Sequence, residues 1–129
     1  MHRVIINAPD APAPAGPYSH SVRVSGELLF ISGQIPIDPA TGELWGTTPA
    51  EQATRCLQNL QTIASAAGTS LKSAVKLTVY LTDIAASAEV NEVYSEFFPH
   101  EPPARVSIAV VGLPRGALVE IDAVIAVED

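Results

Sequence analysis

The sequence predicts an α+β fold in the order β-β-α-β-α-β-β, with one mixed sheet and two helices on one face of that sheet. Three observations carry this prediction. A strong helix signal begins at Thr48, apolar residues alternate over 74–81, and two apolar strands flank a link containing Gly and Pro near the end of the chain. A length of 129 residues predicts a single domain over 1–129.

The N-terminal part of the chain is predicted to form two strands after a proline-rich segment without regular secondary structure. Prolines at four positions between Pro9 and Pro17 limit regular structure beyond residue 6. Residues 21–31 follow a strand-turn-strand pattern, with the turn at 25–27. Because residues 28–31 are all apolar, we expect the second of these strands to be central, with both faces covered.

The first helix has clear boundaries. Thr48 is a favourable N-cap, Pro49 suits the first helical position, and Glu51 completes a capping box. Gly68 is predicted to end the helix. The apolar residues recur at the spacing of one helical face, at Ala53, Leu57, Leu60, Ile63, Ala64 and Ala67. Cys56, beside that stripe, is predicted to be a small core residue rather than a nucleophile.

The remaining elements follow the same logic. Residues 74–81 predict a strand, and Asp83 is expected to cap a second helix that Pro99 ends. Strands are predicted over 105–111 and 118–127, joined by 112–116. The second helix has its apolar stripe at Val90, Val93, Tyr94, Phe97 and Phe98.

Composition excludes several classes of function. Seven Lys and Arg against 14 Asp and Glu give a net charge of -7, which argues against electrostatic DNA binding. Hydrophobic residues make up 47% of the chain and charged residues only 16%, so we expect a folded rather than a disordered chain. The few polar residues would hardly cover a monomer of this size, so we also expect a homo-oligomer rather than a monomer. No apolar run approaches the roughly 18 residues of a membrane span, and the apolar start is too short for a signal peptide. A lone Cys56 allows no internal disulfide and suggests a cytoplasmic setting.

Arg105 is the first candidate site residue. It follows Pro102-Pro103-Ala104 and opens an otherwise apolar strand, on the same face as Ser107 by alternation. An Arg on a water-poor face requires an anionic partner. That partner is either a ligand or an internal carboxylate in a structural ion pair, and the residues alone leave both open.

The second candidate is the pair Glu120 and Asp122, which alternation places on one strand face. A half-buried carboxylate there could act as a general acid or base. The alternative is that both face solvent, although Val124 and Ala126 on the same face are apolar.

Three further residues can be interpreted either as parts of a functional site or as ordinary structural residues. Tyr18 follows a Pro-stiffened turn and is either a hydrogen-bond donor or an aromatic lid. Gly33 ends a strand and marks either a close approach to the backbone or a bend. Asn91 borders the stripe of the second helix and is either functional or merely solvated. The scattered histidines predict no metal site, and no phosphate-binding loop is present.

These residues also carry a resemblance. The chain is similar to the RidA family of imine and enamine deaminases, also labelled YjgF or endoribonuclease L-PSP, along nearly its whole length. The motifs are Gly16-Pro17-Tyr18-Ser19, Ile31-Ser32-Gly33-Gln34-Ile35-Pro36, Ala88-Glu89-Val90-Asn91-Glu92-Val93-Tyr94, Pro103-Ala104-Arg105 and Leu113-Pro114-Arg115-Gly116-Ala117-Leu118-Val119-Glu120-Ile121.

The resemblance implies a chorismate-mutase-like homotrimer with sites between subunits and no cofactor. It implies that Arg105 grips a substrate carboxylate and that Glu120 is associated with the attacking water. The matching pocket positions are Tyr18, Ser32, Gly33, Asn91 and Ser107. Ser107 stands where many deaminating members have Cys, and His20 where Gln is commoner, so the substrate preference is open.

The implied reaction is hydrolysis of 2-imino or enamine acids of the 2-aminoacrylate type to 2-keto acids and ammonia. Three alternatives remain at this point. One is a non-enzymatic module that binds small carboxylates. The others, an endoribonuclease and a translation inhibitor or chaperone, rest on family labels, and the net charge of -7 argues against strong RNA binding.

Overall fold

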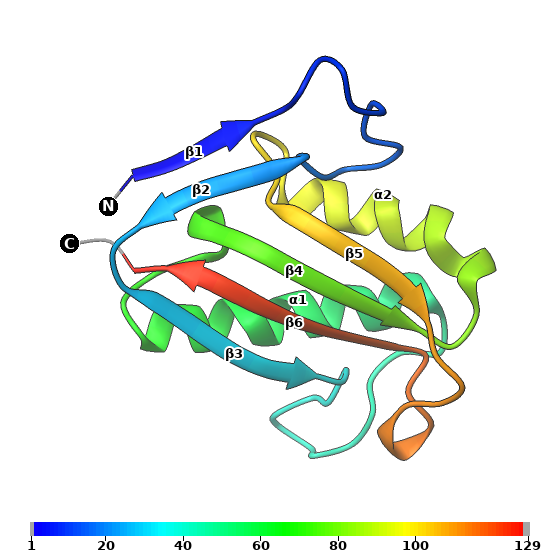
Figure 1. Ribbon diagram of the computed structural model, residues 1–129. Helices are drawn as coiled ribbons and strands as arrows, with labels where there is room; N and C mark the ends of the chain where they lie inside the picture. The colour runs from blue at the N-terminus through cyan, green and yellow to red at the C-terminus, as the bar shows by residue number, and fades with distance from the viewer. Residues whose placement is uncertain (1, 128–129) are drawn as a thin grey trace.

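The computed structural model describes residues 2–127. A four-stranded mixed sheet in the order β3-β6-β4-β5 forms its centre, and two helices lie behind it (Figure 1). Strand β6 is antiparallel to both of its neighbours, whereas β4 and β5 are parallel. The strands are β3 (Leu28–Gln34), β4 (Ala74–Leu81), β5 (Ala104–Ala109) and β6 (Val119–Ala126). The mixed α+β architecture with two helices is therefore confirmed.

The N-terminal region corrects the prediction of one sheet and of a β-β start. Strand β1 (His2–Ile6) pairs antiparallel with β2 (Ser21–Ser25), and the two form a separate two-stranded sheet. The 21–31 segment is thus two strands that belong to different sheets rather than a paired hairpin. Gly26, with φ +106°, turns the chain at the corner between them. The end of β6 is tied there by a 2.9 Å hydrogen bond from Val127 N to Glu27 O.

Helix α1 (Pro49–Ala66) forms as its sequence predicts. Thr48 accepts a hydrogen bond from Glu51 N, and the Glu51 carboxylate accepts one in return from Thr48 N. Gly68, with φ +81°, follows the last turn. Cys56 is fully buried in the core, and burial raises the pKa of its thiol to about 12, with the charge of Glu120 adding to the effect. The thiol is therefore an inert core group, as predicted.

Helix α2 (Ser87–Phe97) differs from the prediction at its start. Asp83 does not cap the helix itself: its Oδ1 accepts a 2.9 Å hydrogen bond from Ala85 N and caps a 3₁₀ turn, Ile84–Ala86, that leads into α2. Val90, Tyr94 and Phe98 of the predicted stripe are buried. A capping residue reports only that a helical turn begins, so the 3₁₀ turn and the α-helix give the same local signal.

The two faces of the sheet differ sharply. Alternate residues of β4 and β6 are buried against α1, including Leu77, Val79, Ile121 and Ile125. No helix of the described residues covers the opposite face (Figure 1). Strand β3 lies at an edge and not in the centre, which corrects the expectation of a doubly covered strand. Its Phe30 is 72% exposed on that open face. A run of apolar residues is compatible with burial inside one chain and with burial between chains. The apolar run over residues 28–31 therefore could not predict whether this strand lies in the centre or at the edge of the sheet.

Candidate functional site

Arg105 lies on the helix-covered side of edge strand β5, in contact with α2 and with the loop before β2. Its Nη1 donates a 2.7 Å hydrogen bond to Asn91 Oδ1 on α2. The guanidinium carbon stands 4.9 Å from the centre of the Tyr94 ring and 5.4 Å from that of the Tyr18 ring. Both distances fall within the range of cation–π contact. The consecutive elements α2 and β5 and the distant loop that holds Tyr18 therefore meet at one guanidinium.

The charge of Arg105 has no counterion within the described residues 2–127. Neither an ion pair nor an electrostatic contact with a carboxylate is formed, and Asn91 supplies only a neutral oxygen. Burial lowers the pKa of Arg105, and the nearby tyrosines Tyr94 and Tyr18 oppose that change. The structural ion pair considered from the sequence is not formed within this part of the chain. A half-buried, permanently charged guanidinium is left with the capacity to bind an external anion.

Tyr18 takes part in the site through its ring. Its hydroxyl oxygen accepts a 3.0 Å hydrogen bond from Ala15 N, which closes a tight loop, while the ring lies against Arg105. The next residue, Ser19, anchors this loop to the chain just before β5, since its Oγ donates to Pro102 O at 2.5 Å. The loop is therefore held over the edge of β5 by its own hydrogen bonds.

Two residues at this site were not predicted to be functional. Tyr94 was expected only as part of the core stripe, yet its fully buried ring supports the guanidinium, and its hydroxyl has no hydrogen-bond partner in the described chain. Gly16 lies so close that a Cβ there would be 3.1 Å from Arg105 Nη2. The helical spacing of apolar residues already accounts for Tyr94 as a core residue. It gave no reason to expect that the ring would also contact the Arg105 guanidinium.

Glu120 lies in a different environment, on the open face at the start of β6. Its carboxylate fits against Gly33, where a Cβ would come within 2.0 Å of Glu120 Oε2. Both readings of Gly33 hold: the Glu120 side chain approaches its backbone closely, and a register shift between Ile31 and Gln34 marks a bulge or irregularity of the strand. Ser32, next to Gly33, is exposed. The absence of a side chain at Gly33 gives the Glu120 carboxylate its place.

A hydrogen-bonded pair of side chains, Tyr80 and Asp122, lies beside Glu120. Tyr80 of β4 stands opposite Glu120 in the antiparallel register, and its hydroxyl donates a 2.9 Å hydrogen bond to Asp122 Oδ2. This bond raises the pKa of Tyr80. Asp122 is thus satisfied by a neighbouring strand, while the Glu120 carboxylate makes no hydrogen bond within residues 2–127.

Sheet register separates the predicted residues into two groups. Arg105 pairs with Leu77, whose side chain is in the helix-covered core, and Ser107 pairs with Val79 on the same side. Glu120 pairs with Tyr80, on the opposite side. The structure therefore brings Tyr18, Asn91 and Arg105 together, and separately Gly33 and Glu120. Within one chain these two groups lie on opposite faces of the sheet.

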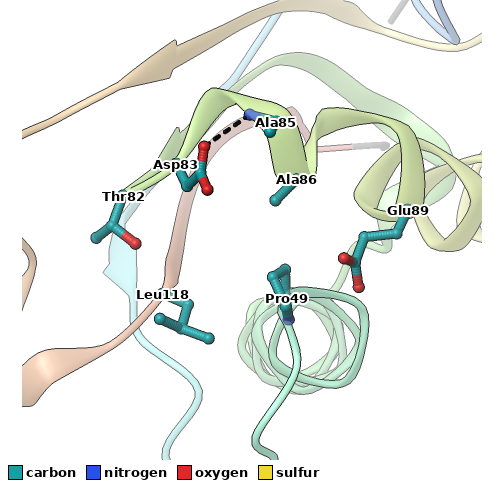
Figure 2. A pocket seen from close by; sticks show the side chains of 7 residues that line it. All are labelled: Pro49, Thr82, Asp83, Ala85, Ala86, Glu89 and Leu118. Atoms are coloured by element: carbon teal, nitrogen blue, oxygen red, sulfur yellow. Dashed lines mark hydrogen bonds between the residues drawn. The ribbon is translucent and has the colours of Figure 1, made fainter.

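A pocket of about 410 Å³ at the start of α1 contains none of the predicted site residues (Figure 2). Its two carboxylates serve the backbone: Asp83 caps Ala85, and Glu89 Oε2 accepts a 3.1 Å hydrogen bond from Ala50 N. The Ala50 N–H in the first turn of α1 is thereby satisfied by Glu89 and is not free to bind an anion in this pocket.

The described residues 2–127 are compatible with neither a metal cluster nor a membrane-spanning helix. No group of three His, Cys, Asp or Glu side chains is placed to hold a metal ion in this part of the chain. Among the helices of the same residues, none has the length and apolar character needed to span a bilayer.

Comparison with known proteins assigns the family. A family model described as endoribonuclease L-PSP matches residues 8–127. The chain belongs to the RidA (YjgF, endoribonuclease L-PSP) family. It is 55% identical to a RutC family protein of Sinorhizobium fredii, over 93% of this chain and 94% of that protein. It is 42% identical to the 2-iminobutanoate/2-iminopropanoate deaminase of Mus musculus, over 95% of this chain and 90% of that protein.

Solved structures of RidA family members have the same fold. RidA from an Antarctic Psychrobacter is 39% identical and superposes with a TM-score of 0.76, covering 96% of this chain and 99% of that one. A Rid family protein of unknown function from Yersinia pestis superposes with a TM-score of 0.85 at 29% identity, covering 98% of this chain and all of that one.

Proposed function

We propose that the protein hydrolyses reactive 2-imino acids and their enamine tautomers, of the 2-aminoacrylate type, to 2-keto acids and ammonia. The observation that carries this proposal is Arg105: a half-buried guanidinium held by neutral neighbours and left without a counterion in the described chain. A planar fork of this kind matches a carboxylate with two charge-assisted hydrogen bonds. The deaminase of Mus musculus, 42% identical, supports the choice of substrate.

The chemistry requires little from the protein once the substrate is oriented. Arg105 binds the carboxylate and presents the imine carbon, which is already electrophilic. Glu120 takes a proton from a water molecule as the oxygen of that water bonds to the imine carbon, and the C=N bond becomes a C–N single bond. Glu120 returns this proton to the nitrogen, which gives a carbinolamine. The hydroxyl proton of the carbinolamine then passes through Glu120 to the amino group, the C–N bond breaks, ammonia leaves and a C=O bond remains. Protein side chains suffice for each of these steps.

This reaction needs a site that contains both Arg105 and Glu120, which one protomer places on opposite faces of its sheet. We therefore propose a homotrimer in which adjacent subunits contribute one group each. The open face supplies a surface for such an assembly, since it carries exposed apolar side chains at Leu28, Phe30, Val106 and Ile108. Tyr18 and Asn91 orient Arg105, while Ser32, Gly33 and Ser107 are proposed to line the space between the subunits.

Two variants and their mixture test this function. With freshly generated 2-iminobutanoate, Arg105→Ala should abolish catalysed hydrolysis, and Glu120→Gln should bind the keto-acid product but turn over slowly. Refolding the two variants together should restore part of the activity, because some interfaces then hold one intact Arg105 and one intact Glu120. Wild-type rates in Arg105→Ala would refute the carboxylate role. Product binding without any hydrolysis by the wild-type protein would favour a carboxylate-binding module instead.

A further inference from the structure

The Arg105 guanidinium has one edge closed and one edge open. Nε is buried and has no hydrogen-bond partner within residues 2–127. Nη1 is occupied in part, by Asn91 Oδ1 at 2.7 Å. Nη2 donates to no acceptor in the same part of the chain. Side-on binding through Nε and Nη2 is therefore closed to a ligand, and the end formed by Nη1 and Nη2 is the edge that remains.

The orientation of this edge is held by aromatic rings. The guanidinium carbon lies 4.9 Å from the Tyr94 ring centre and 5.4 Å from the Tyr18 ring centre, and Tyr94 is fully buried. Rotation of Arg105 would sacrifice both cation–π contacts and the bond to Asn91. The open edge thus has a fixed position in the folded chain.

Gly16 is the residue that faces this edge. A Cβ at Gly16 would lie 3.1 Å from Arg105 Nη2, 3.5 Å from Asn91 Nδ2 and 3.6 Å from the Tyr18 ring. The φ of Gly16 is outside the left-handed region, so the backbone conformation does not require glycine here. What the glycine provides is space beside Nη2.

We propose that Gly16 is part of the ligand-binding site: its missing side chain leaves the room through which a ligand carboxylate reaches the Nη1 and Nη2 end of Arg105. The identity of the ligand, a small 2-imino or 2-keto acid, rests on the proposed function. A methyl group at residue 16 narrows the approach to Nη2, and a branched side chain closes it. The ligand then keeps at most the bond to Nη1 and loses a charge-assisted hydrogen bond.

Calorimetric titration with 2-oxobutanoate tests this proposal on the intact protein. Gly16→Val should weaken binding by about 10- to 100-fold, the loss expected for one hydrogen bond to a charged group. Gly16→Ala should fall between Gly16→Val and the wild type. Gly112→Ala is the matched control, because Gly112 also has an ordinary φ and no atom within 4 Å of its Cβ position, so its affinity should equal that of the wild type.

The outcomes separate this inference from the proposed reaction. Wild-type affinity in both Gly16 variants overturns the inference even if imine hydrolysis is observed. Weakened binding in those variants supports it even if the wild-type protein hydrolyses no imine, in which case the proposed function fails alone. Should Gly16→Val unfold, as judged by its thermal transition, Gly16→Ala decides, since one methyl is added to a permissive backbone. No binding of 2-oxobutanoate by the wild type would overturn the inference.

Discussion

Replacing Gly33 by alanine perturbs Glu120 without touching its chemistry. The added Cβ would stand 2.0 Å from Glu120 Oε2, 3.0 Å from Cδ and 3.3 Å from Cγ. Ordinary van der Waals contact begins near 3.4 Å, so the carboxylate must move by roughly 1 Å or more to make room. The clash involves the far end of a flexible side chain rather than backbone. The fold therefore tolerates the change while the carboxylate is displaced.

The expected loss follows from this displacement. A misplacement of about 1 Å can cost about 100-fold, and a general base contributes about 100- to 10,000-fold in total. We therefore expect Gly33→Ala to lower kcat for 2-iminobutanoate hydrolysis by about 100-fold. Thermal stability should hold or rise slightly, because alanine in a strand is favoured over glycine by about 0.5–1 kcal/mol. Initial rates above the uncatalysed reaction and a thermal melt measure the two effects.

A double-mutant cycle shows whether the loss acts through Glu120. In a Glu120→Gln background, Gly33→Ala should add little, since the group that it displaces no longer accepts a proton. Additive losses would show that Gly33 acts by another route. An unchanged kcat in Gly33→Ala alone would refute the placement of Glu120 against Gly33 in the working site. Gly112→Ala serves again as the control, since a Cβ there meets no atom within 4 Å.

Four further outcomes are expected. Tyr94→Phe should keep activity and gain up to about 1 kcal/mol of stability, because it removes a buried hydroxyl that has no hydrogen-bond partner within residues 2–127 and retains the ring beneath Arg105. Loss of activity would show a role for the hydroxyl. Cys56, with its pKa raised to about 12 from 9.0, should resist a thiol reagent at pH 8 until the protein is denatured. The unfolded thiol loses its proton first, so the contribution of Cys56 to stability is complete below pH 9 and declines toward pH 12, which unfolding at graded pH measures. Sedimentation should give a mass three times the 13.5 kDa of one chain, and a single-chain mass would contradict the composite site.

The sequence by itself determined the local elements of this protein and its family. The capping box at Thr48 and Glu51, the alternation over β4 and the burial of Cys56 appear in the structure as predicted. Each depends on residues a few positions apart, where backbone geometry sets which side chains meet. The motifs around Arg105 and Glu120 likewise lie within short stretches of chain, and the family match over residues 8–127 confirmed the resemblance that they carry.

Only the tertiary structure decided how these elements meet. It moved β3 to an edge, paired β2 with β1, and placed Arg105 and Glu120 on opposite faces of one sheet. It also revealed Tyr94 and Gly16 beside Arg105. Strand order and the approach of a distant loop depend on contacts between residues far apart in the chain. The alternation of side chains along a strand predicts which residues share a face of the sheet. Whether that face is buried depends on the elements that pack against it, and these come from distant parts of the chain.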